Sequence, residues 1–252
     1  MHRHKPGIHD QGDIMTDTIA RTERRAQTGS RTAWRVLGAL VLVHFALLFT
    51  SITFEAMVDP AATPAQVAHA YAHIDPALAS FGMYLETGAF LVFAVAAALA
   101  FRLFATRPGV ARHAATAFIV LATAYVAATI AVGFPPAVAA IHAAHLGADP
   151  VAIAMVNNIR NAGYVLQVAT YAAATIALGV SSIAGRTRVW WGWGAAIIGT
   201  LTLIAGAVDP NLPGMLTMAW WVVLAVSVLV RPPVARAAVA TPDDKVGDQG
   251  AL

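Results

Sequence analysis

The sequence predicts an all-α fold: a polytopic membrane helical bundle of six transmembrane helices with short exoplasmic loop helices. Three observations support this fold class. The chain is 58% hydrophobic and only 12% charged, whereas a soluble domain has about 25% charged residues. Six apolar segments are long enough to cross a hydrocarbon core of about 30 Å. The basic residues lie almost entirely on one side of these segments.

The apolar segments follow one another along the chain, separated by polar loops. They lie near residues 34–54, 81–101, 113–133, 163–183, 189–207 and 214–230. Each is predicted to be helical, because a backbone in lipid must satisfy its own hydrogen bonds. Alanine is abundant in the second, third and fourth segments, which favours helix formation and close packing between helices.

The distribution of basic residues predicts which side of the membrane each loop occupies. All but one of the 16 Lys and Arg residues precede or open the first segment, follow the sixth, or lie between segments two and three or four and five. Only Arg160 lies on the opposite side. The positive-inside rule makes the basic side cytoplasmic. We therefore expect a multi-pass protein of the bacterial inner (cytoplasmic) membrane, with its N-terminus and C-terminus both cytoplasmic.

Three regions are expected along the chain. Residues 1–33 form a basic cytoplasmic tail predicted to be disordered, 34–230 form the transmembrane domain, and 231–252 form a second disordered cytoplasmic tail. Met15 opens an alternative start to Met1. In the exoplasmic loops, Thr63-Pro64 followed by Gln66 predicts a capped helix start. Asp149-Pro150 predicts a second helix, which can continue into the fourth span.

Composition excludes several kinds of chemistry. The chain has no cysteine, which rules out disulfides, thiolate catalysis and cysteine metal sites. A net charge of +3, with basic residues in short runs at helix ends, suits a lipid bilayer as partner and not nucleic acid. Phosphate-binding Gly-rich loops and a Ser-His-Asp elbow motif are not found. We expect no cofactor, and the sequence does not favour an enzyme.

Ionisable groups inside a span are costly and are therefore candidates for substrate or ion binding. Glu86 could hold a proton or coordinate a cation. Alternatively it forms an ion pair with Arg160, or it points outward and snorkels. Arg160 could instead clamp an anionic substrate or lipid headgroup. His44, near the middle of the first span, either donates to a backbone carbonyl of a neighbouring helix or serves as a proton relay or ligand contact.

Four histidines in the exoplasmic loops are the metal candidates. His69 and His73 are spaced i,i+4, and His142 and His145 are spaced i,i+3, so each pair lies on one helical face within reach of a shared metal ion. A nearby carboxylate could complete a zinc-like site. The second pair lacks the glutamate of a His-Glu-x-x-His hydrolase, and histidines in polar loops also serve as solvated or capping residues.

The order of spans and loop helices along the chain resembles that of one known family. A first span is followed by a loop helix (AQVAHAYAH, 65–73) and by a second span entered through FGMYLE (81–86). A second outer helix (VAIAMVNNIR, 151–160) leads into the fourth span through NAGY (161–164). Over roughly residues 34–230 the chain resembles a family of bacterial six-helix integral membrane proteins, a domain of unknown function. The resemblance implies the fold and supplies no activity or site residues.

Three functional hypotheses remain open from the sequence. The leading one is a non-enzymatic membrane protein that binds or transports a small molecule or lipid, or that senses the envelope. The first alternative is a membrane-embedded, metal-dependent enzyme that uses the exoplasmic histidines. The second is a structural or partner-binding membrane subunit, in which Ala-rich helix faces support a homo-oligomer.

Overall fold

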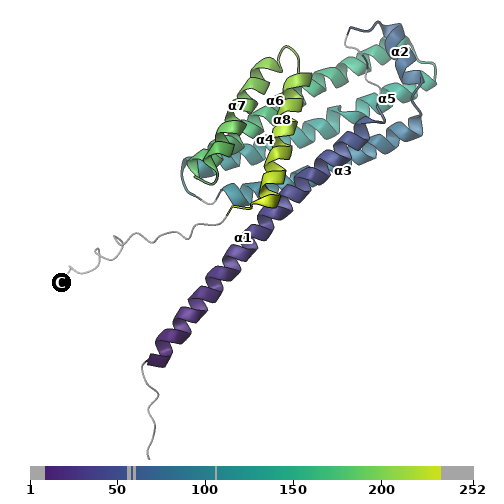
Figure 1. Ribbon diagram of the computed structural model, residues 1–252. Helices are drawn as coiled ribbons and strands as arrows, with labels where there is room; N and C mark the ends of the chain where they lie inside the picture. Colours follow the sequence, from purple (N-terminus) through teal and green to yellow (C-terminus); the bar gives the residue numbers. More distant parts are fainter. Residues whose placement is uncertain (1–8, 56–57, 59–60, 106, 234–252) are drawn as a thin grey trace, which may run out of the picture. The chain divides into compact units, whose positions relative to one another are not determined.

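The fold is helical throughout the part of the chain that the structure describes (Figure 1). The computed structural model describes residues 9–55, 58, 61–105 and 107–233, with side chains from residue 30. The helices are α1 (His9–Ile52), α2 (Pro64–Ala72), α3 (Pro76–Phe104), α4 (Val110–Val132), α5 (Phe134–His145), α6 (Pro150–Ala184), α7 (Val189–Ala205) and α8 (Asn211–Val230). The predicted all-α fold class is therefore confirmed.

The lengths of the helices make this a multi-pass membrane protein. The segments long and apolar enough to cross a membrane are Ser30–Ile52, Pro76–Phe104, Val110–His145, Pro150–Ala184 and Asn211–Val230. Helix α7 is apolar too, but it has only 17 residues. Apart from the early starts of α1 and α6, the helices begin and end within about five residues of the predicted segments, because long apolar runs bounded by Pro, Gly and charged residues leave little freedom in where a span lies.

One predicted boundary is corrected by the structure. Residues 9–33 were expected to be disordered, yet α1 begins at His9. Once the apolar part of α1 has formed a helix, extending it costs far less than nucleating a new one. By contacts, the chain divides into the unit Ala33–Pro232, which holds the bundle, and the terminal segments Met1–Thr32 and Pro233–Leu252. The predicted tail 231–252 lies outside the described residues from 234 onward.

Helix α6 is the central helix of the bundle. It packs most extensively against α4 and α7 and also touches α2, α3, α5 and α8. Its contact with α7 depends on glycine: a Cβ on Gly179 would lie 2.7 Å from the Gly192 carbonyl oxygen, and a Cβ on Gly192 would lie 2.7 Å from the Gly179 carbonyl oxygen. Small residues let two membrane helices approach to backbone contact. In this way the short α7 is held against α6.

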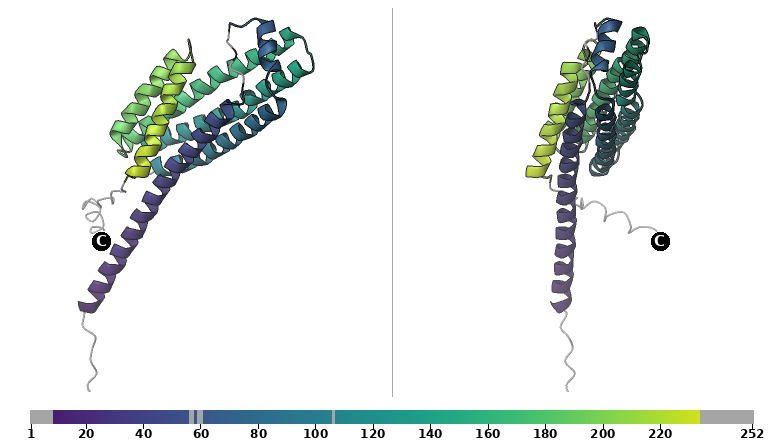
Figure 2. Two further views of the ribbon diagram at one scale, coloured as in Figure 1. Left: turned by 45° about the vertical axis from the view of Figure 1, so that its right-hand side comes forward. Right: turned by 90° about the vertical axis from the view of Figure 1, so that its right-hand side faces the viewer.

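One end of the bundle is formed by α2, α5 and the first turns of α6 (Figures 1 and 2). The predicted capping box is present, since the Thr63 side chain and the Gln66 side chain cap each other's backbone at the start of α2. The Asp149 carboxylate caps α6. A hydrophobic cluster joins these elements. Its buried members are Val67, Tyr71, Ala79, Phe134, Val138, Ala140, Ile141 and Ile153.

Helix α6 is longer than a membrane requires. Its 35 residues span about 52 Å at 1.5 Å per residue, against a hydrocarbon core of about 30 Å. The turn between α7 and α8 meets α6 near its middle, because Gly214 lies beside Tyr164 and Val168. The first turns of α6 therefore extend beyond this turn and pack against α2 and α5.

The glycine contact between α6 and α7 gives a first prediction. Gly179→Ala should lower the free energy of unfolding by about 1–3 kcal/mol, because its methyl group would overpack the interface. Gly88 is the matched control, since a Cβ there meets nothing within 4 Å. Gly88→Ala should leave stability unchanged or raise it by up to about 1 kcal/mol through helix propensity. Thermal unfolding in detergent measures both, and equal effects would contradict the proposed contact.

Candidate functional site

The candidate site lies at a break within the third apolar segment. Residues 110–145 form two helices, α4 and α5, joined at Gly133, whose φ of −79° and ψ of −99° are not helical. Pro135 and Pro136 follow at the start of α5, where a proline needs no hydrogen-bond donor. Local sequence thus explains the break: a glycine adopts the irregular backbone, and two prolines favour a new helix start over a continuous helix.

Glu86 projects from α3 onto this break. Its side chain is only 8% exposed, and its Oε2 accepts a hydrogen bond from the Phe134 backbone N–H at 3.2 Å. Gly133, the N-cap residue of α5, has no side chain to cap the helix. A carboxylate at a helix N-terminus is stabilised by the free N–H groups and the helix dipole. Glu86 therefore caps α5 from a neighbouring helix.

Gly133 leaves space for polar atoms from three helices. A Cβ at residue 133 would lie 2.6 Å from the Thr129 carbonyl oxygen, 3.2 Å from Gln167 Nε2 and 3.3 Å from Glu86 Oε1. On the α6 side, a Cβ on Gly163 would lie 2.6 Å from a Val132 side-chain carbon. The break is therefore enclosed by α3 and α6, with these polar atoms facing the missing side chain of Gly133. We call Glu86, Thr129, Gly133 and Gln167 the break site.

Arg160 has a different partner from the expected one. Its guanidinium forms an ion pair with Glu55, in the loop after α1, and the two side chains are 20% and 9% exposed. The ion pair between Arg160 and Glu86, one of the three alternatives for Glu86, is therefore replaced by the pair with Glu55. Glu55 was missed because it lies in a loop, where no local pattern indicates which helix the residue will meet.

A second polar contact lies next to the ion pair. The buried Tyr71 hydroxyl of α2 donates to Asn157 Oδ1 of α6 at 2.7 Å. Burial raises the pKa of Tyr71 above its usual value, so the hydroxyl keeps its proton and remains a donor. Burial also raises the pKa of the Glu55 carboxyl, and the Arg160 charge opposes part of that rise.

The polar residues of α6 share one side of the helix. Asn157, Arg160, Tyr164 and Gln167 follow at intervals of three, four and three residues, which places them on one helical face. This spacing was the available sequence signal for Asn157 and Gln167. It could have identified the face, although not the partners that the other helices bring to it.

His44 has the packing role that was one of its two predicted alternatives. It is fully buried, and its Nδ1 hydrogen-bonds the Ala89 carbonyl oxygen of α3 at 2.8 Å. The rings of Phe45, Phe90 and Phe93 surround it with centroid distances of 4.9–5.2 Å. Within the described part of the chain, its Nε2 makes no hydrogen bond. His44 thus ties α1 to α3.

The four candidate metal-ligand histidines are placed in two separate arrangements. His69 and His73 stack on α2, with ring centroids 4.3 Å apart, and their Nδ1 atoms are 3.1 Å apart. His145 of α5 hydrogen-bonds the Ile74 carbonyl oxygen at 2.8 Å through Nε2. His142 lies one turn earlier on α5. Among the described residues, no group of three or more His, Asp or Glu side chains could hold a metal ion.

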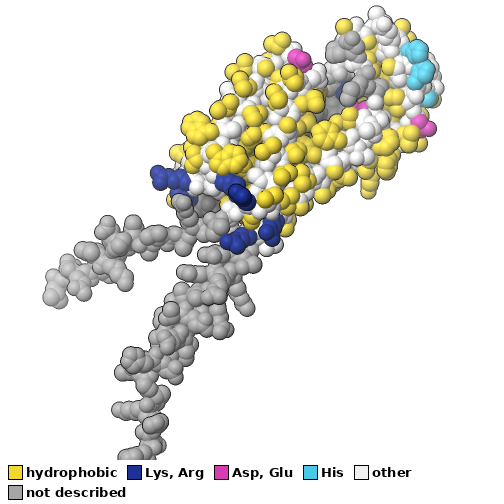
Figure 3. Space-filling model, viewed as in Figure 1, with side chains coloured by type: hydrophobic (Ala, Val, Ile, Leu, Met, Phe, Trp, Pro, Cys, Tyr) yellow, Lys and Arg dark blue, Asp and Glu magenta, His cyan; other side chains and the backbone are white. Residues whose placement is uncertain are grey.

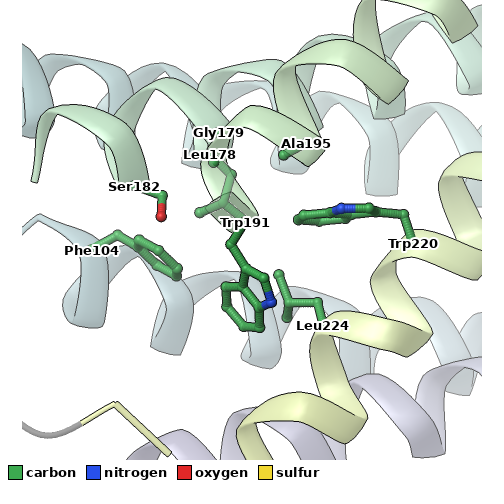
Figure 4. A pocket seen from close by; sticks show the side chains of 9 residues that line it. Phe104, Leu178, Gly179, Ser182, Trp191, Ala195, Trp220 and Leu224 are labelled. Atoms are coloured by element: carbon green, nitrogen blue, oxygen red, sulfur yellow. The ribbon is translucent and has the colours of Figure 1, made fainter. Parts of the chain in front are cut away.

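A narrow crevice lies at the basic end of the bundle (Figure 4). Arg188 lies over the Trp191 ring, 5.4 Å from its centroid. The Ser182 hydroxyl, also at the crevice, donates to the Arg188 carbonyl oxygen. The lining is mostly apolar and consists of Phe104, Leu178, Gly179, Ser182, Trp191, Gly192, Ala195, Trp220 and Leu224. It offers no second group of ionisable side chains comparable with Glu86.

The fold and the site together define a multi-pass helical membrane protein with a buried polar site at a helix break. Comparison of the chain with protein-family models, with curated proteins and with solved structures found no match. The functional argument therefore depends on the geometry and charge of the break site and its neighbours.

The ion pair gives a second prediction. Arg160→Met should cost about 3–5 kcal/mol of stability, because it leaves the Glu55 carboxylate buried without a partner. The double variant Glu55→Met/Arg160→Met should recover most of that loss, since neither charge remains. Chemical unfolding of the single and double variants forms a double-mutant cycle. Arg112→Met, at an exposed position, is the control, and a double variant as unstable as Arg160→Met would contradict the pairing.

Proposed function

We propose that this chain is a non-enzymatic transport or sensing protein of the bacterial cytoplasmic membrane that binds a proton or a small cation at Glu86. The observation that carries this proposal is the Glu86 carboxylate at the break between α4 and α5. A lipid or a larger solute, which the sequence also allowed, fits less well with a buried carboxylate enclosed by packed helices.

A helix break is a favourable place for an ion inside a membrane protein. Non-helical backbone at membrane depth is tolerated only where protein encloses it or where it lines a cavity. The two half-helix ends expose N–H groups on one side and carbonyl oxygens on the other, and transporters use such ends to coordinate ions and substrates. Here the N–H end of α5 contacts Glu86, and the Thr129 carbonyl lies in the last turn of α4.

The charge of the neighbourhood favours a positive ligand. Glu55 and Arg160 neutralise each other in their ion pair, so an ionised Glu86 adds one unpaired negative charge to a buried region. An isolated buried charge is costly and is relieved by a proton or a counterion. Arg160 is already engaged by Glu55, which disfavours its predicted use as a clamp for an anionic substrate.

The packing of the first and last spans supports six crossings. A Cβ on Gly38, near the start of the α1 span, would lie 2.7 Å from the Ala225 carbonyl oxygen and 2.9 Å from Leu229 in the last turns of α8. This contact supports placing the start of the first span and the end of the last span on the same side, and hence an even number of crossings. Counting α7 makes the number six, and 17 residues is at the lower end of the range for a transmembrane helix.

The charge distribution supports a cytoplasmic location for both ends. Figure 3 shows Lys and Arg side chains gathered at one end of the bundle and His side chains at the other, with an apolar flank between them. The basic end includes Arg102 at the end of α3, Arg188 at the start of α7 and Arg231 after α8. By the positive-inside rule this end is cytoplasmic, so Glu86 lies in the exoplasmic half.

The cysteine-free chain permits a direct test of this topology. Leu146→Cys and Val208→Cys, at positions 87% and 92% exposed, should react with a membrane-impermeant maleimide in intact cells. Val110→Cys, at the first residue of α4, should react only after the membrane is permeabilised. Protection of Val208→Cys in intact cells would show that α7 does not cross the membrane.

The proposed ligand at Glu86 gives the functional test. Infrared difference spectra between mildly acidic and mildly alkaline buffer should contain the band of a buried carboxyl group that gains or loses a proton. Glu86→Gln should abolish this band, because the amide keeps an acceptor for the Phe134 N–H but cannot titrate. Glu55→Gln is the control and should retain the band. A spectrum that is unchanged in Glu86→Gln would rule out Glu86 as the binding group.

A further inference from the structure

We propose that Arg188 and Arg231 bind the phosphate group of an anionic phospholipid at the surface where α7 begins and α8 ends. The two residues are far apart in the chain and meet at the basic end of the bundle. This inference goes beyond the proposed function and is independent of it, because it concerns the surface that faces lipid and not the ligand of Glu86.

Arg188 is held in place by contacts with both helices. Its guanidinium lies over the Trp191 ring of α7, 5.4 Å from the ring centroid, and it donates to the Arg231 carbonyl oxygen directly after α8. The Ser182 hydroxyl of α6 donates to the Arg188 carbonyl oxygen at 3.1 Å. A guanidinium has five N–H donors, so these contacts leave donors for an anion. Because the side chain is already ordered, an anion that binds it costs less conformational entropy.

A second arginine charge acts on Arg188. The Arg231 side chain is exposed at the end of α8. Burial lowers the pKa of Arg188, and the charge of Arg231 lowers it further, which shows that the two like charges disfavour each other. Arg186 adds another exposed guanidinium in the turn before α7. An anion bound to Arg188 and Arg231 would relieve this repulsion, and a phosphate matches the planar fork of a guanidinium.

The described carboxylates lie elsewhere in the bundle. Asp209 follows the last turn of α7, whereas Arg188 precedes the first turn of the same helix. Figure 3 shows the Asp and Glu side chains of this face away from the basic end. Among the described residues, neither Arg188 nor Arg231 has a carboxylate partner. A headgroup with a net negative charge therefore complements this surface, whereas the ammonium group of a zwitterionic lipid would be repelled by it.

The surroundings favour a lipid over a soluble phosphate. Trp190 and Trp193 are exposed at the start of α7, and tryptophan is enriched at the level of the headgroups. Ile197 and Leu201 are also exposed, and they follow Trp193 at intervals of four residues, which places all three on one helical face. A phospholipid with its phosphate at the arginines could lay its acyl chains along this apolar face. Basic surfaces between membrane helices bind anionic headgroups in this way.

The test measures the unfolding temperature of the purified full-length protein in detergent. Phosphatidylglycerol and phosphatidylcholine are titrated separately into the micelles, and inorganic phosphate is titrated in a third series. Salt at about 0.15 M screens exposed charges that are more than about 8 Å apart, so the remaining effects report direct contacts. A lipid that binds only the folded protein raises the midpoint in a saturable way. The wild type should show this rise with phosphatidylglycerol and not in the other two series.

Three variants locate the binding surface. Arg188→Gln and Arg231→Gln should each weaken the apparent affinity for phosphatidylglycerol about tenfold or more, because each loses a hydrogen bond to a charged group. Arg112→Gln is the matched control: it removes the same charge from an exposed position at the start of α4, and its affinity should stay within about twofold of the wild type. If Arg188→Gln does not fold, Arg231→Gln decides the outcome, because its backbone carbonyl can still accept from Arg188.

Three results would overturn the inference. The first is no saturable rise with phosphatidylglycerol in the wild type. The second is an equal rise with phosphatidylcholine or with inorganic phosphate. The third is an equal loss of affinity in Arg112→Gln and in the two site variants, which would indicate attraction to the basic end as a whole. None of these results affects the infrared band of Glu86, so the inference can fail while the proposed function stands.

Discussion

The capping of α5 by Glu86 is the interaction on which the end of the bundle formed by α2, α5 and the start of α6 depends. Gly133 ends α4 and cannot cap the next helix with a side chain, so the Phe134 N–H at the start of α5 needs an acceptor from elsewhere. Glu86 supplies it from α3. Because α5 also packs in a hydrophobic cluster with α2 and α6, this single polar contact links the long apolar helix α3 to that end of the bundle.

Helix α6 connects this contact with the rest of the molecule. One face carries Asn157 toward Tyr71 of α2, Arg160 toward Glu55 in the loop after α1, and Gln167 toward Gly133. Farther along, Gly179 allows backbone contact with α7. Small and polar residues therefore have different roles on α6. The small residues allow close packing between helices in the membrane. The polar residues are the groups with which the interior can bind a ligand.

The agreement between the predicted and observed helices has a local cause. Thr63 and Gln66 form the expected capping box, and Asp149 caps α6 as expected, because these contacts involve residues only a few positions apart. Because His44 lies near the middle of the first span, the sequence left it two roles: a hydrogen bond to a neighbouring backbone carbonyl, or a proton relay or ligand contact. The structure shows the first of these, with Ala89 as the partner. The site was less predictable. Glu86 was singled out because an ionisable group inside a membrane span is energetically costly. The alternative that paired it with Arg160 was wrong, since Arg160 pairs with Glu55.

The sequence by itself determined the helical class, the long apolar spans and the helix caps, since hydrophobicity, charge and short-range hydrogen bonds are properties of neighbouring residues. Only the tertiary structure decided that Arg160 pairs with Glu55, that Glu86 caps α5, and that Gln167 and Thr129 face Gly133. These contacts join residues far apart in the chain, and helix packing brings them together. Several side chains offered Glu86 a chemically reasonable partner, and the distances in the folded bundle selected among them.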